Sequence, residues 1–124
     1  MVDMDHVPEP DEMRALVQPL DDLDRKVLGG LVAIWMANPG KVKDREWTSQ
    51  QFVHVATVAH GFPEEGPAST DDVERIRGYA QQHMERVLRV GFALFVRVAQ
   101  DMQQRSGGFS FDDAQAVVRD YLAR

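Results

Sequence analysis

The sequence predicts an all-α fold, a single-domain helical bundle of four to five helices organised around one long helix at about residues 70–105. Apolar residues recur three and four positions apart between glycine and proline stops, which is the period of an amphipathic helix. Residues suited to helix N-caps precede several of these segments. Hydrophobic residues make up 44% of the 124 residues, which is enough for one core. We therefore expect an acidic N-terminal arm at residues 1–10 and one helical domain at residues 11–124.

The first part of the chain carries the signals of two helices. A short helix is expected just before Pro19, because proline ends a helix. The next helix, over residues 21–37, opens with aspartates, which suit the N-cap and the positive end of the helix dipole. Gly29 and Gly30 lie inside this helix, where glycine lowers helix stability. We expect them to permit a close crossing with another helix.

A third helix is predicted over residues 48–60. Thr48 and Gln51 stand three positions apart, as in a capping box, so Thr48 is the expected N-cap. Gly61 follows the segment and is a typical helix stop.

The remaining chain predicts the long helix and a short last one. Ser69 or Thr70 is the expected cap of a helix that nothing interrupts before the glycines at 107–108. At about 1.5 Å per residue this helix is roughly 50 Å long, longer than any other helix of the chain. Ser110 is the expected cap of the last helix.

Residues 87–99 are apolar almost all the way round, apart from Arg89 and Arg97. A helix on a monomer's surface needs an apolar stripe of only ~100°. Two arrangements would bury the excess: the shorter helices enclose residues 87–99 while residues 70–84 project, or the spare face meets a second copy. We favour the second, a homodimer, in which the arginine heads reach water or carboxylates. The expected self-association residues are Val87, Leu88, Gly91, Phe92, Phe95 and Val98.

Composition and spacing argue against several kinds of site. The chain has no cysteine, which removes disulfides, thiolate metal sites and cysteine nucleophiles. His54 and His60 are six positions apart, so they point in different directions from one helix, and we expect no metal ligands and no cofactor. Ser49, Ser69 and Ser110 are interpreted as capping residues, and no catalytic residue is assigned.

The acidic charge is concentrated at the N-terminus. Residues 1–24 hold eight acidic side chains and one basic one, whereas residues 25–124 hold twelve acidic and thirteen basic, giving a net charge of −6. The opening MVDMDHVPEPDE is acidic where a secretory leader is basic, and no apolar run approaches the ~20 residues that span a bilayer. We therefore expect a cytoplasmic protein that does not contact a membrane.

The expected function is that of a non-catalytic small helical interaction, adaptor or assembly protein that self-associates and binds a larger protein partner. A small all-α enzyme without a local motif is an alternative, because active sites in helical bundles often leave no sequence signature.

A helix-turn-helix-like DNA-binding regulator is a further alternative. The segment LDRKVLGGLV resembles the first helix of winged-helix regulators, and WTSQQF resembles the start of a second. The would-be recognition helix, however, opens with Asp71, Asp72 and Glu74, which phosphates repel. If DNA is bound, the expected contacts are Lys41, Lys43, Arg45, Arg75 and Arg77.

Overall fold

The computed structural model describes residues 7–62, 69–104 and 110–123 and confirms the all-α prediction, since these residues contain helices and no strand. The helices are α1 (Pro10–Val17), α2 (Asp22–Ala37), the 3-10 turn η1 (Pro39–Lys41), α3 (Arg45–Ala59), α4 (Thr70–Gln103) and α5 (Phe111–Leu122).

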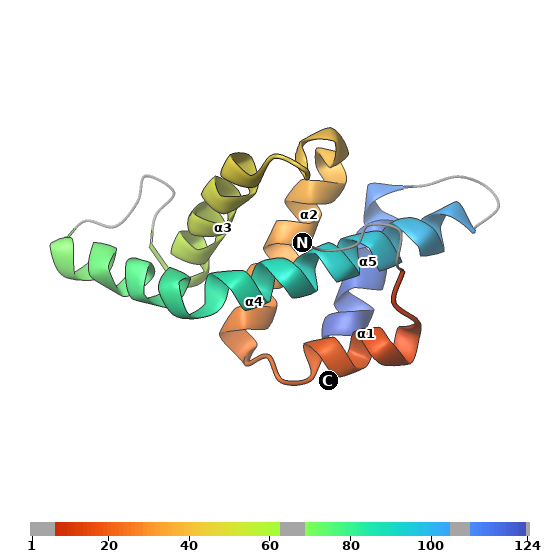
Figure 1. Cartoon of the computed structure of the whole chain (residues 1–124), viewed down its shortest axis with the longest axis horizontal. Helices are drawn as coiled ribbons and strands as arrows, with labels where there is room; N and C mark the ends of the chain where they lie inside the picture. Colours follow the sequence, from red (N-terminus) through yellow and green to blue (C-terminus); the bar gives the residue numbers. More distant parts are fainter. Residues whose placement is uncertain (1–6, 63–68, 105–109, 124) are drawn as a thin grey trace.

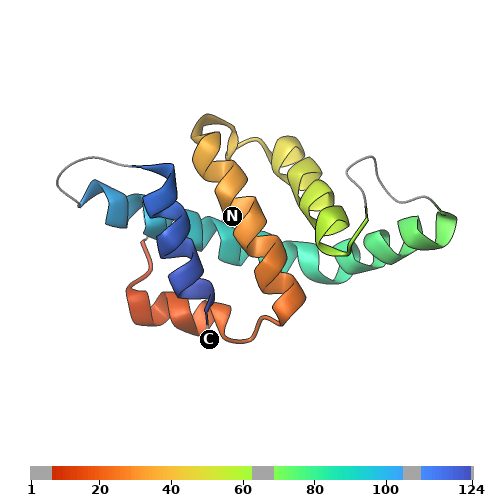
Figure 2. The same ribbon diagram turned by 180° about the vertical axis from the view of Figure 1, so that it is seen from behind.

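Helix α4 is a continuous rod of 34 residues on which the other helices assemble. Helix α2 crosses the middle of the rod, with α3 on one side of it and α5 on the other (Figure 1). Figure 2 shows α2, α3 and α5 side by side across one face of α4, and α1 packs against α4 and α5. The N-terminal end of α4 extends beyond α3 and the rest of the body (Figure 1).

Three of the expected caps are present. The side chains of Asp21, Ser69 and Ser110 each accept a hydrogen bond from the backbone N–H three residues later, at the start of α2, α4 and α5. These bonds satisfy N–H groups that have no partner inside the helix, which explains why the boundaries follow the sequence signals.

The predicted cap of the third helix is wrong. Helix α3 begins at Arg45, three residues earlier than expected, because the side chain of Asp44 accepts from the Trp47 N–H at 3.1 Å. Thr48 is a buried residue inside the helix, and its hydroxyl donates to the Arg45 carbonyl. Ser49 is likewise within the helix and is not a cap.

The expected close crossing at the glycine pair is confirmed. A Cβ atom on Gly30 would lie 2.8 Å from Cγ1 of Val55, so a larger residue would push α2 and α3 apart. Gly91 serves the same purpose between α2 and α4, since a Cβ there would lie 2.9 Å from Cζ3 of Trp35. Both glycines lower the intrinsic stability of their own helix, but they allow the neighbouring helices to pack in direct contact.

The apolar residues 87–99 are enclosed by the chain itself, so our reason for expecting a second copy at this stretch is wrong. Val87, Gly91, Phe95 and Val98 are buried within the chain, and only Leu88 and Phe92, of the six expected self-association residues, are half-buried. Phe92 stacks on Trp35 at a ring-centroid distance of 4.9 Å. The alternative arrangement is observed in part: the chain encloses residues 87–99, but only the first turns of α4 project, because Tyr79 is buried and His83 contacts Asp24 of α2.

None of the helices in the three described segments combines the length and apolarity that a membrane span requires.

Candidate functional site

The most concentrated group of ionisable side chains surrounds Asp24, near the N-terminus of α2. Its backbone N–H donates to the Asp21 side chain at 2.8 Å, which places it in the first turn of the helix. Its side chain lies on the apolar face of α2, and Asp24 is only 1% exposed. A carboxylate removed from water in this way requires hydrogen-bond donors inside the protein.

Helix α4 supplies both donors. Tyr79 and His83 are four residues apart and share the face that packs on α2. The Tyr79 hydroxyl donates to Oδ1 of Asp24 at 2.7 Å. Nδ1 of His83 lies 3.1 Å from Oδ1 and 3.3 Å from Oδ2 of the same carboxyl group. The three side chains join α2 to α4 directly after residues 70–78 of α4. These residues extend beyond the other helices and are called the projecting half of α4.

Aromatic rings from α3 and α4 surround this cluster. Tyr79 stacks between Phe52, at 5.8 Å, and His83, at 4.7 Å between ring centroids. His60 meets the edge of Tyr79 at 5.0 Å, and its Nδ1 lies 2.6 Å from the Ala56 carbonyl oxygen. The rings exclude water from the phenol.

Both tyrosines are held in the neutral state. Burial, together with the hydrogen bond to Asp24 and the negative charge of that group, raises the pKa of Tyr79 far above its ordinary value of 10.0. Burial and the negative charge of Asp101 raise the pKa of Tyr121 in the same direction. The folded state therefore disfavours the tyrosinate form at both positions.

We expect the fold to become less stable as the pH is raised above about 10. In the unfolded chain both phenols ionise near pH 10, whereas the folded state holds them neutral, so their contribution to stability is present below that pH and declines above it. Tyrosinate absorbance and loss of the helical circular dichroism signal should appear together. A phenol that titrates near pH 10 in a fully helical protein would contradict the structure.

A histidine oriented by a buried carboxylate supplies two of the three members of a catalytic triad, because Nε2 remains free to exchange a proton. The third member, a nucleophile, is not found at this site in the described structure. The buried hydroxyls of Thr48 and Thr57 both donate to carbonyls of α3. What the arrangement shows is a polar contact that joins α2 to α4.

A second buried polar group ties the N-terminal segment to α4. Arg97 is 7% exposed, and its Nη1 donates to the Pro8 carbonyl at 2.9 Å. Its Nη2 donates to Asp101, which also accepts a 3.4 Å hydrogen bond from Tyr121. The Arg97 head therefore reaches a carboxylate, one of the two expected outcomes, but it does so as a buried side chain rather than at the water-exposed surface. Arg89, in contrast, is exposed to water, and its Nη1 lies 3.9 Å from Oε1 of Glu85.

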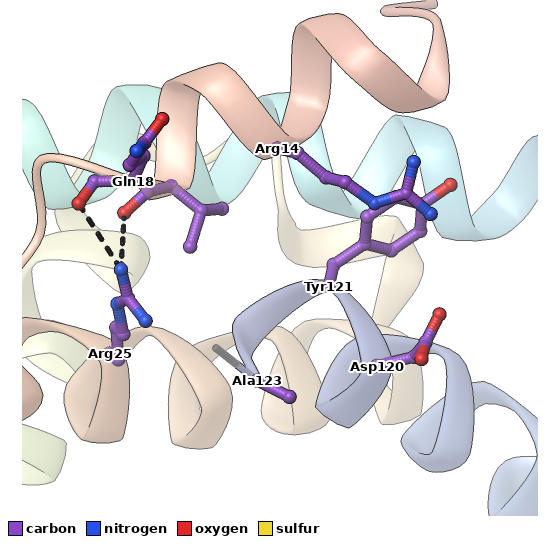
Figure 3. Close-up of a pocket in the computed structure, with 7 residues that line it drawn as sticks. Arg14, Gln18, Arg25, Asp120, Tyr121 and Ala123 are labelled. Atoms are coloured by element: carbon purple, nitrogen blue, oxygen red, sulfur yellow. Dashed lines mark hydrogen bonds between the residues drawn. The ribbon is translucent and has the colours of Figure 1, made fainter.

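A cleft lies where the C-terminal ends of α1 and α5 meet α2 (Figure 3). Arg25 donates to the carbonyls of Val17, Gln18 and Leu122, at helix C-terminal ends that carry partial negative charge, and to the carbonyl of Leu20 in the connection before α2. The residues that line the cleft are Arg14, Val17, Gln18, Arg25, Asp120, Tyr121 and Ala123. Because Arg25 of α2 donates hydrogen bonds to carbonyls at the ends of α1 and α5, it holds these three helices together.

No protein-family model, curated protein or solved structure matches this chain.

The expected nucleic-acid residues are not brought together in one patch. Lys41, Lys43 and Arg45 lie at the connection that leads into α3, whereas Arg75 and Arg77 lie on the projecting end of α4 (Figure 1). Helix α3, with 15 residues and a length of about 22 Å, separates the two groups. Arg77 is in addition paired with Glu74 at 3.2 Å. This placement does not favour a DNA-binding surface.

In the described ranges, no three histidine, aspartate or glutamate side chains come close enough together to hold a metal ion. The pair of Asp24 and His83 is the nearest approach to such a group that we describe.

The cluster around Asp24 was not predicted, because Tyr79 and His83 lie 55 and 59 residues after Asp24 in the sequence. Two signals could have found it. Asp24 falls between Leu20 and Val27 on the apolar face of its helix, and Tyr79 and His83 interrupt the apolar stripe of α4. Polar residues at core positions need buried partners, and these two sets supply a carboxylate and its donors.

Proposed function

We propose that this chain is a non-catalytic helical interaction protein that self-associates and binds a larger protein partner through the projecting half of α4. The observation that carries the proposal is the exposure of this segment. Between Ser69 and Arg77 only Ile76 is buried, and Val73 is 40% exposed although it continues the apolar stripe of the helix. A helix extended into water in this way buries little surface within its own domain.

Two further features support a role in binding rather than catalysis. The buried ionisable groups, Asp24 and Arg97, are engaged by the chain's own side chains and carbonyls. The projecting segment mixes acidic and basic residues, as Asp71 and Arg75 illustrate, and such mixed charge suits a protein surface better than a polyanion.

A photo-crosslinking residue placed at Val73 tests the proposal. Leu16 on α1 is the matched control, because it is an apolar residue of the same exposure, 38% against 40% for Val73. In cells of the native organism we expect specific adducts at Val73 with one or a few other proteins, and few at Leu16. Equal labelling at the two positions, or no adduct at Val73, would contradict the proposal.

A further inference from the structure

Gly78 is a glycine in the interior of α4 that the chain's own fold does not explain. Glycine destabilises a helix interior by about 1 kcal/mol relative to alanine. At Gly29, Gly30 and Gly91 an added Cβ would meet a side chain of another helix at 3.3 Å or less, whereas at Gly78 it would meet nothing within 4 Å. The position is in the projecting half of α4, where another chain has room to approach.

Gly78 lies near the centre of a polar stripe on the outer face of α4, which begins in the projecting half and continues beyond it to Arg89. The stripe residues follow one another at alternating steps of four and three, which keeps them on one side of a helix. They are Asp71, Arg75, Gly78, Gln82, Glu85 and Arg89. All except the half-buried Gly78 are exposed. The same steps lead on through Phe92 to Val96, which is only 8% exposed, so the chain covers the stripe at one end and leaves it open at the other.

We propose that two copies of the chain pair antiparallel along this stripe, about a two-fold axis midway between Gly78 and Gln82. This register places Asp71 opposite Arg89 of the partner subunit and Arg75 opposite Glu85 of the partner subunit. Beside the stripe, Glu74 faces Arg86 of the partner subunit. The inference rests on the proposed function and names the face through which the chain self-associates.

Charge complementarity selects this arrangement over the alternatives. In the antiparallel register each of these charges meets one of opposite sign, and the two-fold axis repeats every pair. In a parallel, in-register pair Asp71 would face the same residue of the partner subunit, as would Arg75 and Glu85, and like charges would repel.

Gly78 completes the fit at the centre of the stripe. It faces Gln82 of the partner subunit, and the absence of a side chain lets the two helix backbones approach at the axis. A contact made mainly by exposed charges is weak, so the dimer forms at high protein concentration and low salt.

Charge reversal tests the pairing, with sedimentation of the full chain at low salt as the measurement. Arg75→Glu or Glu85→Arg alone should weaken self-association by about tenfold, and the double variant should restore it, because the pair is rebuilt with exchanged signs. Lys26→Glu, at an exposed position of α2, is the control and should leave association unchanged. Added salt should weaken the wild-type dimer and the double variant alike.

Gly78→Ala gives an independent readout. Alanine has room within the chain and a higher helix propensity, so the melting temperature of the monomer should rise while self-association weakens. Unchanged association in this variant, or failure of the double variant to recover, would overturn the pairing. A wild-type chain that stays monomeric at every concentration would also overturn it, whereas adducts of another protein at Val73 would still support the proposed interaction function.

Discussion

Replacing Trp35 by alanine is expected to lower the free energy of unfolding by about 3–5 kcal/mol, the range for removing a large aromatic side chain from a core. Trp35 is fully buried in α2 and is the residue against which α4 packs. It stacks on Phe92 at 4.9 Å and meets the edge of Phe95 at 6.4 Å, while Gly91 makes room for its ring. Its loss leaves a cavity at the crossing of the two helices on which the bundle depends.

The chain holds two tryptophans, so the second provides the control. Trp47 is half-buried on α3, with Nζ of Lys41 5.9 Å from its ring centre. Trp47→Ala should cost less, about 2 kcal/mol, because the Trp47 ring is only partly buried at the edge of the core. Urea unfolding followed by circular dichroism measures both variants. Equal losses in the two variants would mean that Trp35 does not hold the α2–α4 crossing.

A milder variant separates packing from polarity at the same position. Nε1 of Trp35 is buried and has no hydrogen-bond partner. Trp35→Phe keeps an aromatic ring and removes this unpartnered donor, so its loss of stability should be well below that of Trp35→Ala.

The helix boundaries could be predicted where one capping residue stood without a competitor. Ser69 and Ser110 each precede a helix and have a glycine-containing segment before them, so the local signal agreed with the fold. At α3 two caps competed, and Asp44 was missed in favour of Thr48 because Thr48 and Gln51 have the spacing of a capping box. Local hydrogen bonds decide such boundaries, and a pattern of residue types does not rank them.

The enclosure of residues 87–99 could not be predicted because it depends on where the shorter helices pack. The sequence shows how apolar this stretch is, but it does not show that α2 and α5 lie side by side across it while α1 also packs on α4. Arg97 shows the same limit. Its place among apolar residues suggested a side chain that reaches water or a carboxylate; it does bind the Asp101 carboxylate, but its second partner is the carbonyl of Pro8, 89 residues away. The spacing of residues within one segment can mark a polar residue at a core position, but it does not identify the distant residue that is its partner.

Replacing Tyr79 by phenylalanine is expected to lower the free energy of unfolding by about 2–3 kcal/mol at neutral pH. The variant keeps the ring that stacks on Phe52 and His83, and it removes only the hydroxyl that donates to Asp24 at 2.7 Å. A buried carboxyl group then depends on His83 alone, and an unpaired acceptor inside a protein costs more than the net gain from one hydrogen bond.

Tyr121→Phe is the matched control for this change. Its hydroxyl lies 3.4 Å from Asp101, and that carboxylate keeps its bond from Arg97, so the loss should be about 0.5 kcal/mol or less. The denaturation midpoint should fall for Tyr79→Phe with little change in the denaturant slope, because the same surface is exposed on unfolding.

A double-mutant cycle with Asp24→Asn tests whether the carboxylate is the cause. Asparagine keeps an acceptor for the Tyr79 hydroxyl but removes the negative charge that makes this hydrogen bond strong. Loss of the hydroxyl should therefore cost less in the Asp24→Asn background than in the wild type, by about 1 kcal/mol or more. If the two costs were equal, the negative charge of Asp24 would add nothing to the hydrogen bond from Tyr79, and the proposed strength of this bond would be wrong.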